Sequence, residues 1–217
     1  MSDFATRREV MVDTQVRPSD VTKFPIIDAM LSVLRENFVP RDKREVAYIG
    51  ENVVLGNGRV VLEPRTLAKT LDSLNISKDE LVLDIGSGLG YSSAVISLLA
   101  EAVVALEDDA DWVRESEEAF QEFGADNILV ECGPLHEGAP KHGPYDVICI
   151  QGAVEQIPQQ IISQLKDGGR LACIFSNGAL GSAKIGYKLD GSMNWRFAFN
   201  AGAPLLGGFE KPHNFEF

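Results

Sequence analysis

Two acidic residues and a glycine-rich turn form the most informative stretch of this sequence. Asp84 lies just before Gly86-Ser87-Gly88-Leu89-Gly90, and Glu107 ends the next apolar run. Glycine turns of this kind let a ligand approach the backbone at the start of a helix. A carboxylate at the end of the following strand can accept hydrogen bonds from both hydroxyls of a ribose. The pattern therefore predicts a site for a ligand that contains a nucleoside.

The spacing of the glycines separates two classes of nucleotide ligand. A dinucleotide fingerprint needs G-x-G-x-x-G, because pyrophosphate must reach the backbone at the helix N-terminus. Here the turn reads G-x-G-x-G. The carboxylate of Asp84 would repel a phosphate and attract an ammonium group. We therefore expect an adenosyl group that carries an amino acid, bound by Asp84, Gly86, Ser87, Gly88, Gly90, Glu107 and Asp108. Of the acids after Glu107, Asp109 and Asp111 are expected to cap the next helix.

The segments around this turn alternate between strand-like and helix-like patterns. Short apolar runs fall at Leu81–Ile85, Val103–Glu107, Ile128–Cys132, Tyr145–Ile150 and Arg170–Phe175, with helix-like runs at Tyr91–Leu99, Ala110–Phe123 and Ile157–Leu165. Continuous apolar runs are typical of parallel strands that are covered on both faces. The alternation predicts an α/β fold with a doubly wound, mostly parallel sheet. A turn signal at Asp190-Gly191 adds a C-terminal antiparallel hairpin, for seven strands in all.

The segment before the sheet, about residues 1–45, is expected to be helical. In it, Ile27, Met30, Leu31, Leu34 and Phe38 share one helical face. That face fits either a packing helix or a lid over a site. Neither a linker nor a repeat divides the sequence, so we expect one domain over residues 1–217.

Composition limits the classes of binding partner and the cellular location that we expect for this protein. The 217 residues carry a net charge of −12, and a surface that acidic repels phosphate backbones, so we expect no nucleic-acid partner. The three cysteines and three histidines lack the spacing of a metal site. No apolar run approaches transmembrane length, and the first residues contain no hydrophobic signal region. We therefore expect a cytoplasmic protein without a membrane partner.

Asp84, the glycine turn, Glu107 and the seven expected strands together resemble the S-adenosylmethionine-dependent methyltransferases. Within that class, the chain resembles the protein-L-isoaspartate O-methyltransferases over roughly residues 11–178. The matching motifs are Met11–Gln15, Ala29-Met30, Val33–Pro40, Ala47-Tyr48, Leu81–Ser97, Gly143–Ile148, Ile157-Pro158 and Leu165–Leu171. The resemblance implies S-adenosyl-L-methionine as cofactor and methyl transfer to a carboxylate of an isoaspartyl protein or peptide, which repairs damaged proteins.

The active-site loop of that family is where this chain departs from it. The family reads Gly-Gln-Thr-Ile-Ser-x-Pro, and residues 58–64 here read GRVVLEP. Arg59, Val60 and Leu62 therefore stand at the candidate catalytic positions, with both hydroxyls lost. The guanidinium of Arg59 could pair bidentately with an acceptor carboxylate, or it could face solvent. Glu63 is expected to be a charge at the start of a helix.

Three further positions are candidates for the cofactor site. The family's Gly-Asp-Gly after the third strand is Gly133-Pro134-Leu135 here, so contacts from Gly133 and Leu135 to an adenine would be apolar or made by the backbone. Gln151 follows the fourth strand, at the end where acceptor-side residues lie. The C-terminal aromatic residues, among them Trp195, Phe197 and Phe209, fit either core packing or an acceptor pocket.

The lost hydroxyls leave two alternatives to isoaspartyl repair. The chain could be a divergent paralogue that binds S-adenosylmethionine without repairing isoaspartate. It could also methylate a small molecule, because an apolar loop suits a less polar acceptor.

Overall fold

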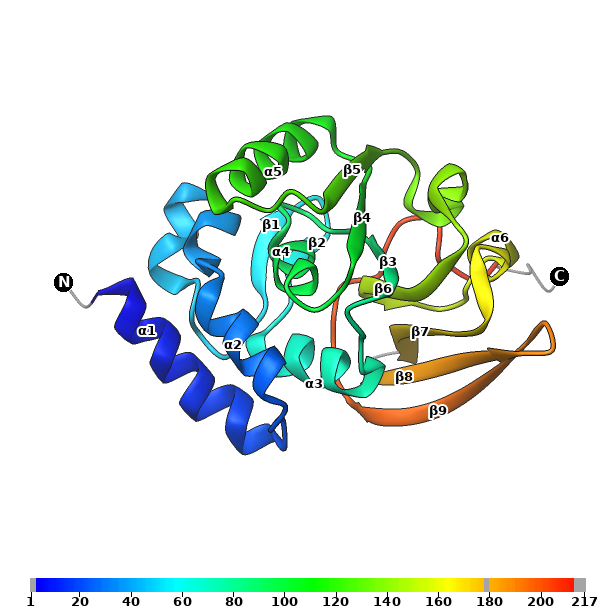
Figure 1. Ribbon diagram of the computed structural model, residues 1–217, viewed down its shortest axis with the longest axis horizontal. Coiled ribbons are helices and arrows are strands. Elements are labelled where there is room, and N and C mark those ends of the chain that lie inside the picture. The colour runs from blue at the N-terminus through cyan, green and yellow to red at the C-terminus, as the bar shows by residue number, and fades with distance from the viewer. Residues whose placement is uncertain (1–2, 178–179, 213–217) are drawn as a thin grey trace, which may run out of the picture.

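The computed structural model describes residues 3–177 and 180–212, and a twisted sheet of seven strands lies at its centre (Figure 1). The order across the sheet is β5-β4-β3-β6-β7-β8-β9. The strands are β3 (Leu81–Ile85), β4 (Ala102–Glu107), β5 (Ile128–Cys132), β6 (Tyr145–Val154), β7 (Leu165–Asn177), β8 (Leu180–Leu189) and β9 (Ser192–Asn200). The order reverses between β3 and β6, and ligands of doubly wound sheets bind at the carboxyl ends of such strands.

Pairing in the sheet is parallel from β5 through β7 and antiparallel at β8 and β9. Asp190 and Gly191 join β8 to β9, and both have a positive φ angle, as a two-residue hairpin turn requires. The predicted α/β fold, with a doubly wound, mostly parallel sheet and a C-terminal antiparallel hairpin, is confirmed.

Six α-helices pack around the sheet in the described part of the chain: α1 (Phe4–Met11), α2 (Phe24–Ser32), α3 (Pro64–Leu74), α4 (Tyr91–Ser97), α5 (Ala110–Phe123) and α6 (Gln159–Ser163). The carboxylate of Asp109 accepts hydrogen bonds from the first amides of α5, which confirms it as a helix cap. None of the helices in the described ranges is long and apolar enough to cross a membrane.

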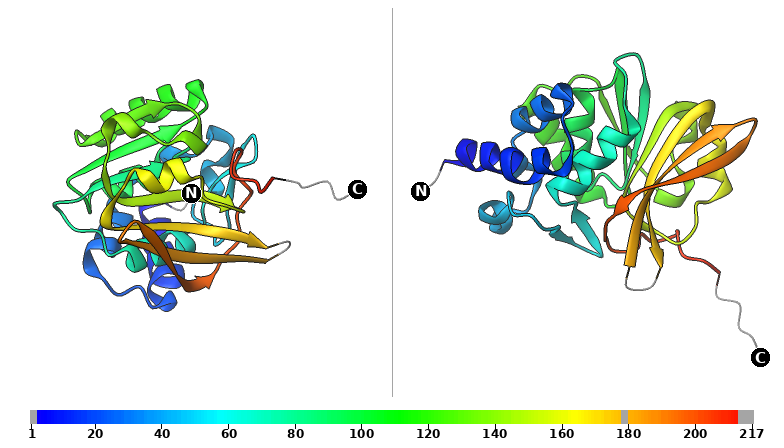
Figure 2. Two further views of the ribbon diagram at one scale, coloured as in Figure 1. Left: turned by 90° about the vertical axis from the view of Figure 1, so that its right-hand side faces the viewer. Right: turned by 90° about the horizontal axis from the view of Figure 1, so that it is seen from below.

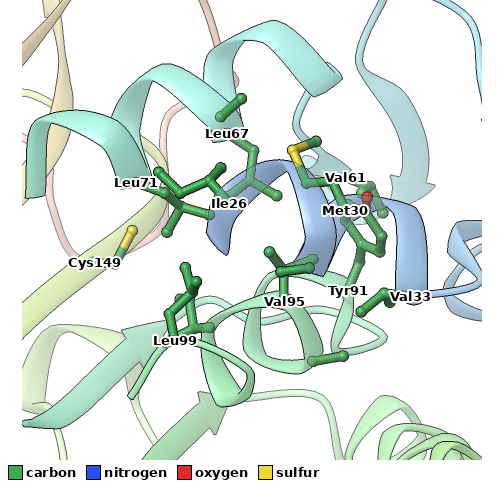
Figure 3. Close-up of a cluster of buried hydrophobic side chains, with 14 of the residues drawn as sticks. Ile26, Met30, Val33, Val61, Leu67, Leu71, Tyr91, Val95, Leu99 and Cys149 are labelled. Carbon is green, nitrogen blue, oxygen red and sulfur yellow. The ribbon is translucent and has the colours of Figure 1, made fainter. Parts of the chain in front are cut away.

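Side chains of the central strands alternate between two apolar layers. Val82 and Val103 face the layer that contains α2, α3 and α4, whereas Leu83 and Leu106 face the layer that contains α6. Figure 3 shows the first layer, where Met30 of α2, Leu71 of α3 and Val95 of α4 converge. The N-terminal helices and the β8–β9 hairpin lie at opposite ends of the molecule (Figure 2, right).

The N-terminal segment is helical over Phe4–Val46, but in short pieces. The helical face predicted to run to Phe38 is wrong after Ser32, where Val33 takes an extended conformation. Leu34 is then 38% exposed, while Arg35 is fully buried. The guanidinium of Arg35 explains the break, because it donates to the carbonyls of Ala47 and Leu62. The core residues of α2 confirm the packing interpretation of this segment.

A small hairpin precedes α3, and it was not among the elements predicted from the sequence. Strands β1 (Val53–Gly56) and β2 (Arg59–Val61) pair antiparallel around Asn57 and Gly58, which both have positive φ angles. The hairpin makes Arg59 the first residue of β2. The direction of β2 then decides where the side chain of Arg59 lies.

Candidate functional site

The glycine turn between β3 and α4 is folded tightly against the end of β4. Gly86, Gly88 and Gly90 all have φ angles in the left-handed region, at 78°, 58° and 97°. A Cβ atom on Gly88 would lie 2.7 Å from Leu55, and one on Gly90 would overlap the ring of Phe120. The amide of Gly88 donates to Oε2 of Glu107 at 2.6 Å. The turn thus requires glycine at these positions, and it places the amide of Gly88 within hydrogen-bond distance of Glu107, the last residue of β4.

Asp84 is fully buried on the α4 side of the sheet. Its Oδ2 accepts hydrogen bonds from the hydroxyls of Ser92 and Ser93, and its Oδ1 accepts one from the amide of Gln151, all at 2.6 Å. Burial raises the pKa of Asp84, and these three donors oppose that rise. The carboxylate therefore ties β3, α4 and β6 together, rather than facing open space as a partner for an ammonium group. Gln151 is connected to the site by its hydrogen bond to Asp84.

Glu107 is also fully buried, and it accepts hydrogen bonds from the residues around it, among them a long one of 3.4 Å from the amide of Asp109 to Oε1. Besides the amide of Gly88, the amide of Asp108 donates to its Oε1 at 2.9 Å. Arg59 completes the set with two parallel bonds, Nη1 to Oε1 at 2.9 Å and Nη2 to Oε2 at 2.6 Å. Burial raises the pKa of the Glu107 carboxyl, and the hydrogen bonds from Arg59 oppose that rise.

Arg59 is only 6% exposed, so the interpretation as a solvent-facing arginine is wrong. Its Nη1 also lies 3.2 Å from Oδ1 of Asp108, and its guanidinium lies 5.8 Å from the centre of the Trp112 ring. The reason is the β1–β2 hairpin, which directs the first side chain of β2 toward the end of β4. Arg59 and Glu107 are separated by 48 positions in sequence, so no local pattern could pair them.

A cavity of about 280 Å³ opens beside this ion pair. Its walls are Asn57, Arg59, Asp108, Asp109, Trp112, Leu135, Leu205 and Gly207. Gly133 and Leu135, two of the predicted positions, lie with Asp108 along an adjoining surface hollow. Sequence reasoning missed Trp112, although its place one turn into α5 after the Asp109 cap is a usable signal. It also missed Leu205 and Gly207, for which the sequence contains no motif.

The C-terminal segment after β9 returns to the carboxyl end of β6. The amide of Ala153 donates to the carbonyl of Pro204 at 2.8 Å, and the amide of Leu206 donates to the carbonyl of Ala153 at 2.9 Å. A Cβ atom on Gly152 would lie 2.5 Å from Leu206, so only glycine admits this side chain. Leu206 is 1% exposed and lies between Gly152 and Gly86, above the glycine turn.

Val60 and Leu62, which stand where the family has hydroxyls, are both buried in an apolar cluster. They pack with Ala153, Ile174 and Phe199. With Ser87 and Gln151 they also line a very small cavity, of about 10 Å³. The buried hydroxyl of Ser87 has no hydrogen-bond partner among the described residues.

The remaining loop and hairpin predictions concern structural roles. Glu63 immediately precedes α3 and accepts a hydrogen bond from Thr66, which confirms it as a charge at a helix start. Phe209 is buried and Trp195 packs edge-on against Phe175, which confirms core packing for these aromatic residues. Phe197 is 63% exposed and lies outside that core.

The sheet order and the glycine turn place the chain in the structural class of Rossmann-like methyltransferases. The chain is similar to a solved protein-L-isoaspartate O-methyltransferase, with a TM-score of 0.81 and 24% identity over 93% of this chain and 66% of that one. It is also similar to a putative protein-L-isoaspartate O-methyltransferase from Plasmodium falciparum, solved in complex with S-adenosyl-L-homocysteine, with a TM-score of 0.78 and 18% identity over 95% and 99% of the two chains. These likenesses establish the fold.

The family itself is established by sequence. The model of the protein-L-isoaspartate(D-aspartate) O-methyltransferase family matches residues 6–183. Protein-L-isoaspartate O-methyltransferases from Opitutus terrae and Methanoculleus marisnigri are 32% and 35% identical over 164 residues, which is 76% of this chain and 70% and 74% of theirs. The chain belongs to the protein-L-isoaspartate(D-aspartate) O-methyltransferase family. This membership confirms the predicted family, and S-adenosyl-L-methionine is the methyl donor of this enzyme class.

Proposed function

We propose that this chain binds S-adenosyl-L-methionine at the carboxyl ends of β3, β4 and β6 and methylates the carboxylate of an L-isoaspartyl protein or peptide. Glu107 carries the proposal, as a buried carboxylate at the end of β4 that is held by the amides of Gly88 and Asp108. Its two oxygens are suited to accept hydrogen bonds from the two hydroxyls of a ribose. Membership of the family supplies the reaction class.

The residues around Glu107 fit such a cofactor in chemical type. The adjoining hollow along Gly133 and Leu135 offers apolar contact for an adenine. The glycine turn offers its backbone, and the unpartnered hydroxyl of Ser87 is available to the amino-acid end. The space above Gly86 is filled by Arg59 and Leu206, so the fit requires these two side chains to move.

The chemistry asks for positioning more than for a base. When bound, the cofactor supplies a methyl group on a positively charged sulfur. A carboxylate acceptor is already nucleophilic, so the chain needs only to align it and to exclude water. Val60 and Leu62 are suited to desolvate the acceptor side, and the network of Asp84 and Gln151 holds the floor of the site in place.

A second candidate function follows from the same loop. Val60 and Leu62 replace hydroxyls and pack against Phe199, and an apolar loop of this kind also suits a less polar small-molecule acceptor. A paralogue that binds the cofactor without transferring its methyl group has the same support.

Incubation with methyl-labelled S-adenosylmethionine and an isoaspartyl peptide tests the acceptor, with the matching aspartyl peptide as control. We expect label that is released as methanol by mild alkali, and only with the isoaspartyl peptide. Label above background on neither peptide would rule out repair. A parallel incubation with a metabolite extract then separates a small-molecule methyltransferase from a binding-only paralogue.

Calorimetry with S-adenosylhomocysteine tests the cofactor site independently of any acceptor. We expect Glu107→Gln to weaken binding about tenfold or more when both proteins also carry Arg59→Met, because no guanidinium then occupies Glu107 and a neutral amide offers the ribose one acceptor in place of two. Glu117→Gln, at an exposed position of α5, is the matched control and should bind as its parent protein does. Equal affinity of the Arg59→Met proteins with and without Glu107→Gln would contradict a ribose contact at Glu107.

A further inference from the structure

The ribose-binding carboxylate is already occupied by a side chain of the same protein. Both oxygens of Glu107 accept hydrogen bonds from Arg59, in the parallel arrangement that makes arginine–carboxylate pairs strong. A ribose that binds Glu107 must therefore take the place of the guanidinium. We propose that Arg59 is an internal competitor for the cofactor site, and that cofactor binding moves its guanidinium from Glu107 onto Asp108. This inference rests on the proposed function, since it concerns the same site.

The space above the glycine turn shows the same competition in steric terms. A Cβ atom on Gly86 would lie 3.0 Å from Nη2 of Arg59 and 3.5 Å from Cδ1 of Leu206. In a glycine turn that binds a ligand, this is the space the ligand needs in order to approach the backbone. Arg59 therefore blocks both the hydrogen-bond acceptors of the ribose site and the approach to the turn.

Asp108 is the acceptor to which the displaced guanidinium can move. A guanidinium that is 6% exposed cannot be left without a carboxylate partner unless a large desolvation cost is met. Nη1 of Arg59 is already 3.2 Å from Oδ1 of Asp108, whose side chain is 52% exposed. The guanidinium can thus turn about this contact and keep a carboxylate partner throughout.

Two neighbours support the displaced position. Trp112 offers its ring face, with the guanidinium already 5.8 Å from the ring centre. The cavity beside the pair is lined by both Arg59 and Asp108, so the side chain has room in that direction. The planar fork of arginine is needed to hold both oxygens of Glu107 and to reach Asp108 at once, which a lysine cannot do.

Calorimetric titration of S-adenosylhomocysteine into four proteins tests the exchange: the wild type, Arg59→Met, Asp108→Asn and the double variant. We expect Arg59→Met to bind about tenfold more tightly or better, because Glu107 is then free of the guanidinium in every molecule. Asp108→Asn should bind more weakly than the wild type, because the displaced guanidinium loses its second carboxylate. In the Arg59→Met background the same Asp108→Asn change should weaken binding much less than it does in the wild type.

The double variant separates this exchange from a direct contact between Asp108 and the ligand. If Asp108→Asn weakens binding equally in both backgrounds, or if Arg59→Met binds no more tightly than the wild type, the inference is overturned while the proposed function stands. Absence of binding in all four proteins would instead overturn the proposed cofactor. Asp111→Asn, also near the start of α5, controls for the change in charge and should have no effect.

The conservative variant Arg59→Lys keeps a charge in the buried position and covers the case in which Arg59→Met does not fold. We expect its affinity to lie between those of the wild type and Arg59→Met, because an ammonium cannot hold both oxygens of Glu107. Affinity equal to or weaker than that of the wild type would count against the exchange. Thermal unfolding of each free variant verifies that all are folded before titration.

Discussion

Asp84 shows how a single buried carboxylate organises this site. Its three donors come from α4 and β6, so one side chain fixes the spacing between β3 and both neighbours. An ionised carboxylate without accessible surface is tolerated only when its lone pairs are satisfied in this way. The fixed spacing in turn holds the glycine turn, which lies directly after β3.

The raised pKa of Asp84 leads to a prediction about pH. A carboxyl whose pKa is higher in the folded chain binds its proton more tightly there than in the unfolded chain. Its contribution to stability is therefore complete below the ordinary pKa of aspartate and is lost as the pH rises through the folded value. We expect the stability of the wild type relative to Asp84→Asn to fall as the pH rises above the ordinary pKa of aspartate. Urea unfolding of both proteins measures it, and a difference that grows with pH would contradict the prediction.

Arg35 gives a second prediction for a single residue. It is fully buried, donates to the carbonyls of Ala47 and Leu62, and lies 4.5 Å from the centre of the Tyr91 ring. We expect Arg35→Met to lower the free energy of unfolding by about 2–4 kcal/mol, because two carbonyls lose their donor. Arg44→Met, at an exposed position, should change it by less than about 0.5 kcal/mol. Chemical denaturation compares the two, and equal effects would contradict the prediction.

Among the elements, the contact between the glycine turn and α5 can be isolated by a matched pair of glycines. Gly90 and Gly124 both have positive φ angles, so alanine strains the backbone at either position. A Cβ atom on Gly124 meets open space, whereas one on Gly90 overlaps Phe120 of α5. We expect Gly90→Ala to destabilise the fold by about 1–3 kcal/mol more than Gly124→Ala. Similar losses of unfolding free energy for the two variants, measured in urea, would contradict the prediction and show that α5 can shift to make room for the added methyl group.

The elements that sequence predicted well are those with a strong local signal. The five parallel strands were found because each is a short, mostly apolar run. The β1–β2 hairpin was missed because its strands have four and three residues. Asn57-Gly58 is nevertheless the dipeptide most typical of a tight hairpin turn, and it could have revealed the strands. The break after Ser32 was not predictable, because it accompanies hydrogen bonds from the Arg35 guanidinium to carbonyls that are distant in sequence.

The same distinction applies to the candidate site. Glu107 and the glycine turn lie close in sequence, so their pattern predicts their proximity. The partners that close the site come from far along the chain: Arg59 from β2 and Leu206 from the C-terminal segment. Periodicity and motif spacing contain no information on contacts of that separation. Sequence alone therefore could not show that Arg59 and Leu206 occupy the space above the glycine turn.

On the scale of the whole molecule, the C-terminal segment links the far end of the chain to the centre of the sheet. Phe209 is fully buried in the layer that contains α6, and its carbonyl accepts hydrogen bonds from Glu155 and Gln156. We expect Phe209→Ala to lower the free energy of unfolding by about 3–5 kcal/mol. Phe197→Ala, at an exposed position of the edge strand β9, should change it by less than about 0.5 kcal/mol. A comparable loss from both, measured by thermal and chemical unfolding, would contradict this assignment.

The ion pair between Arg59 and Glu107 also affects the rate at which the site binds a ligand. A tethered side chain competes at a fixed effective concentration, whatever the amount of protein. Under the proposed exchange, Arg59 weakens the binding of the methyl donor and of the demethylated product by the same factor, because both bind the same carboxylate. Discrimination between them is then unchanged, while each associates more slowly, because only a fraction of the free molecules has an open site. The pair thus sets how fast the site takes up a ligand, and other residues decide which ligand it prefers.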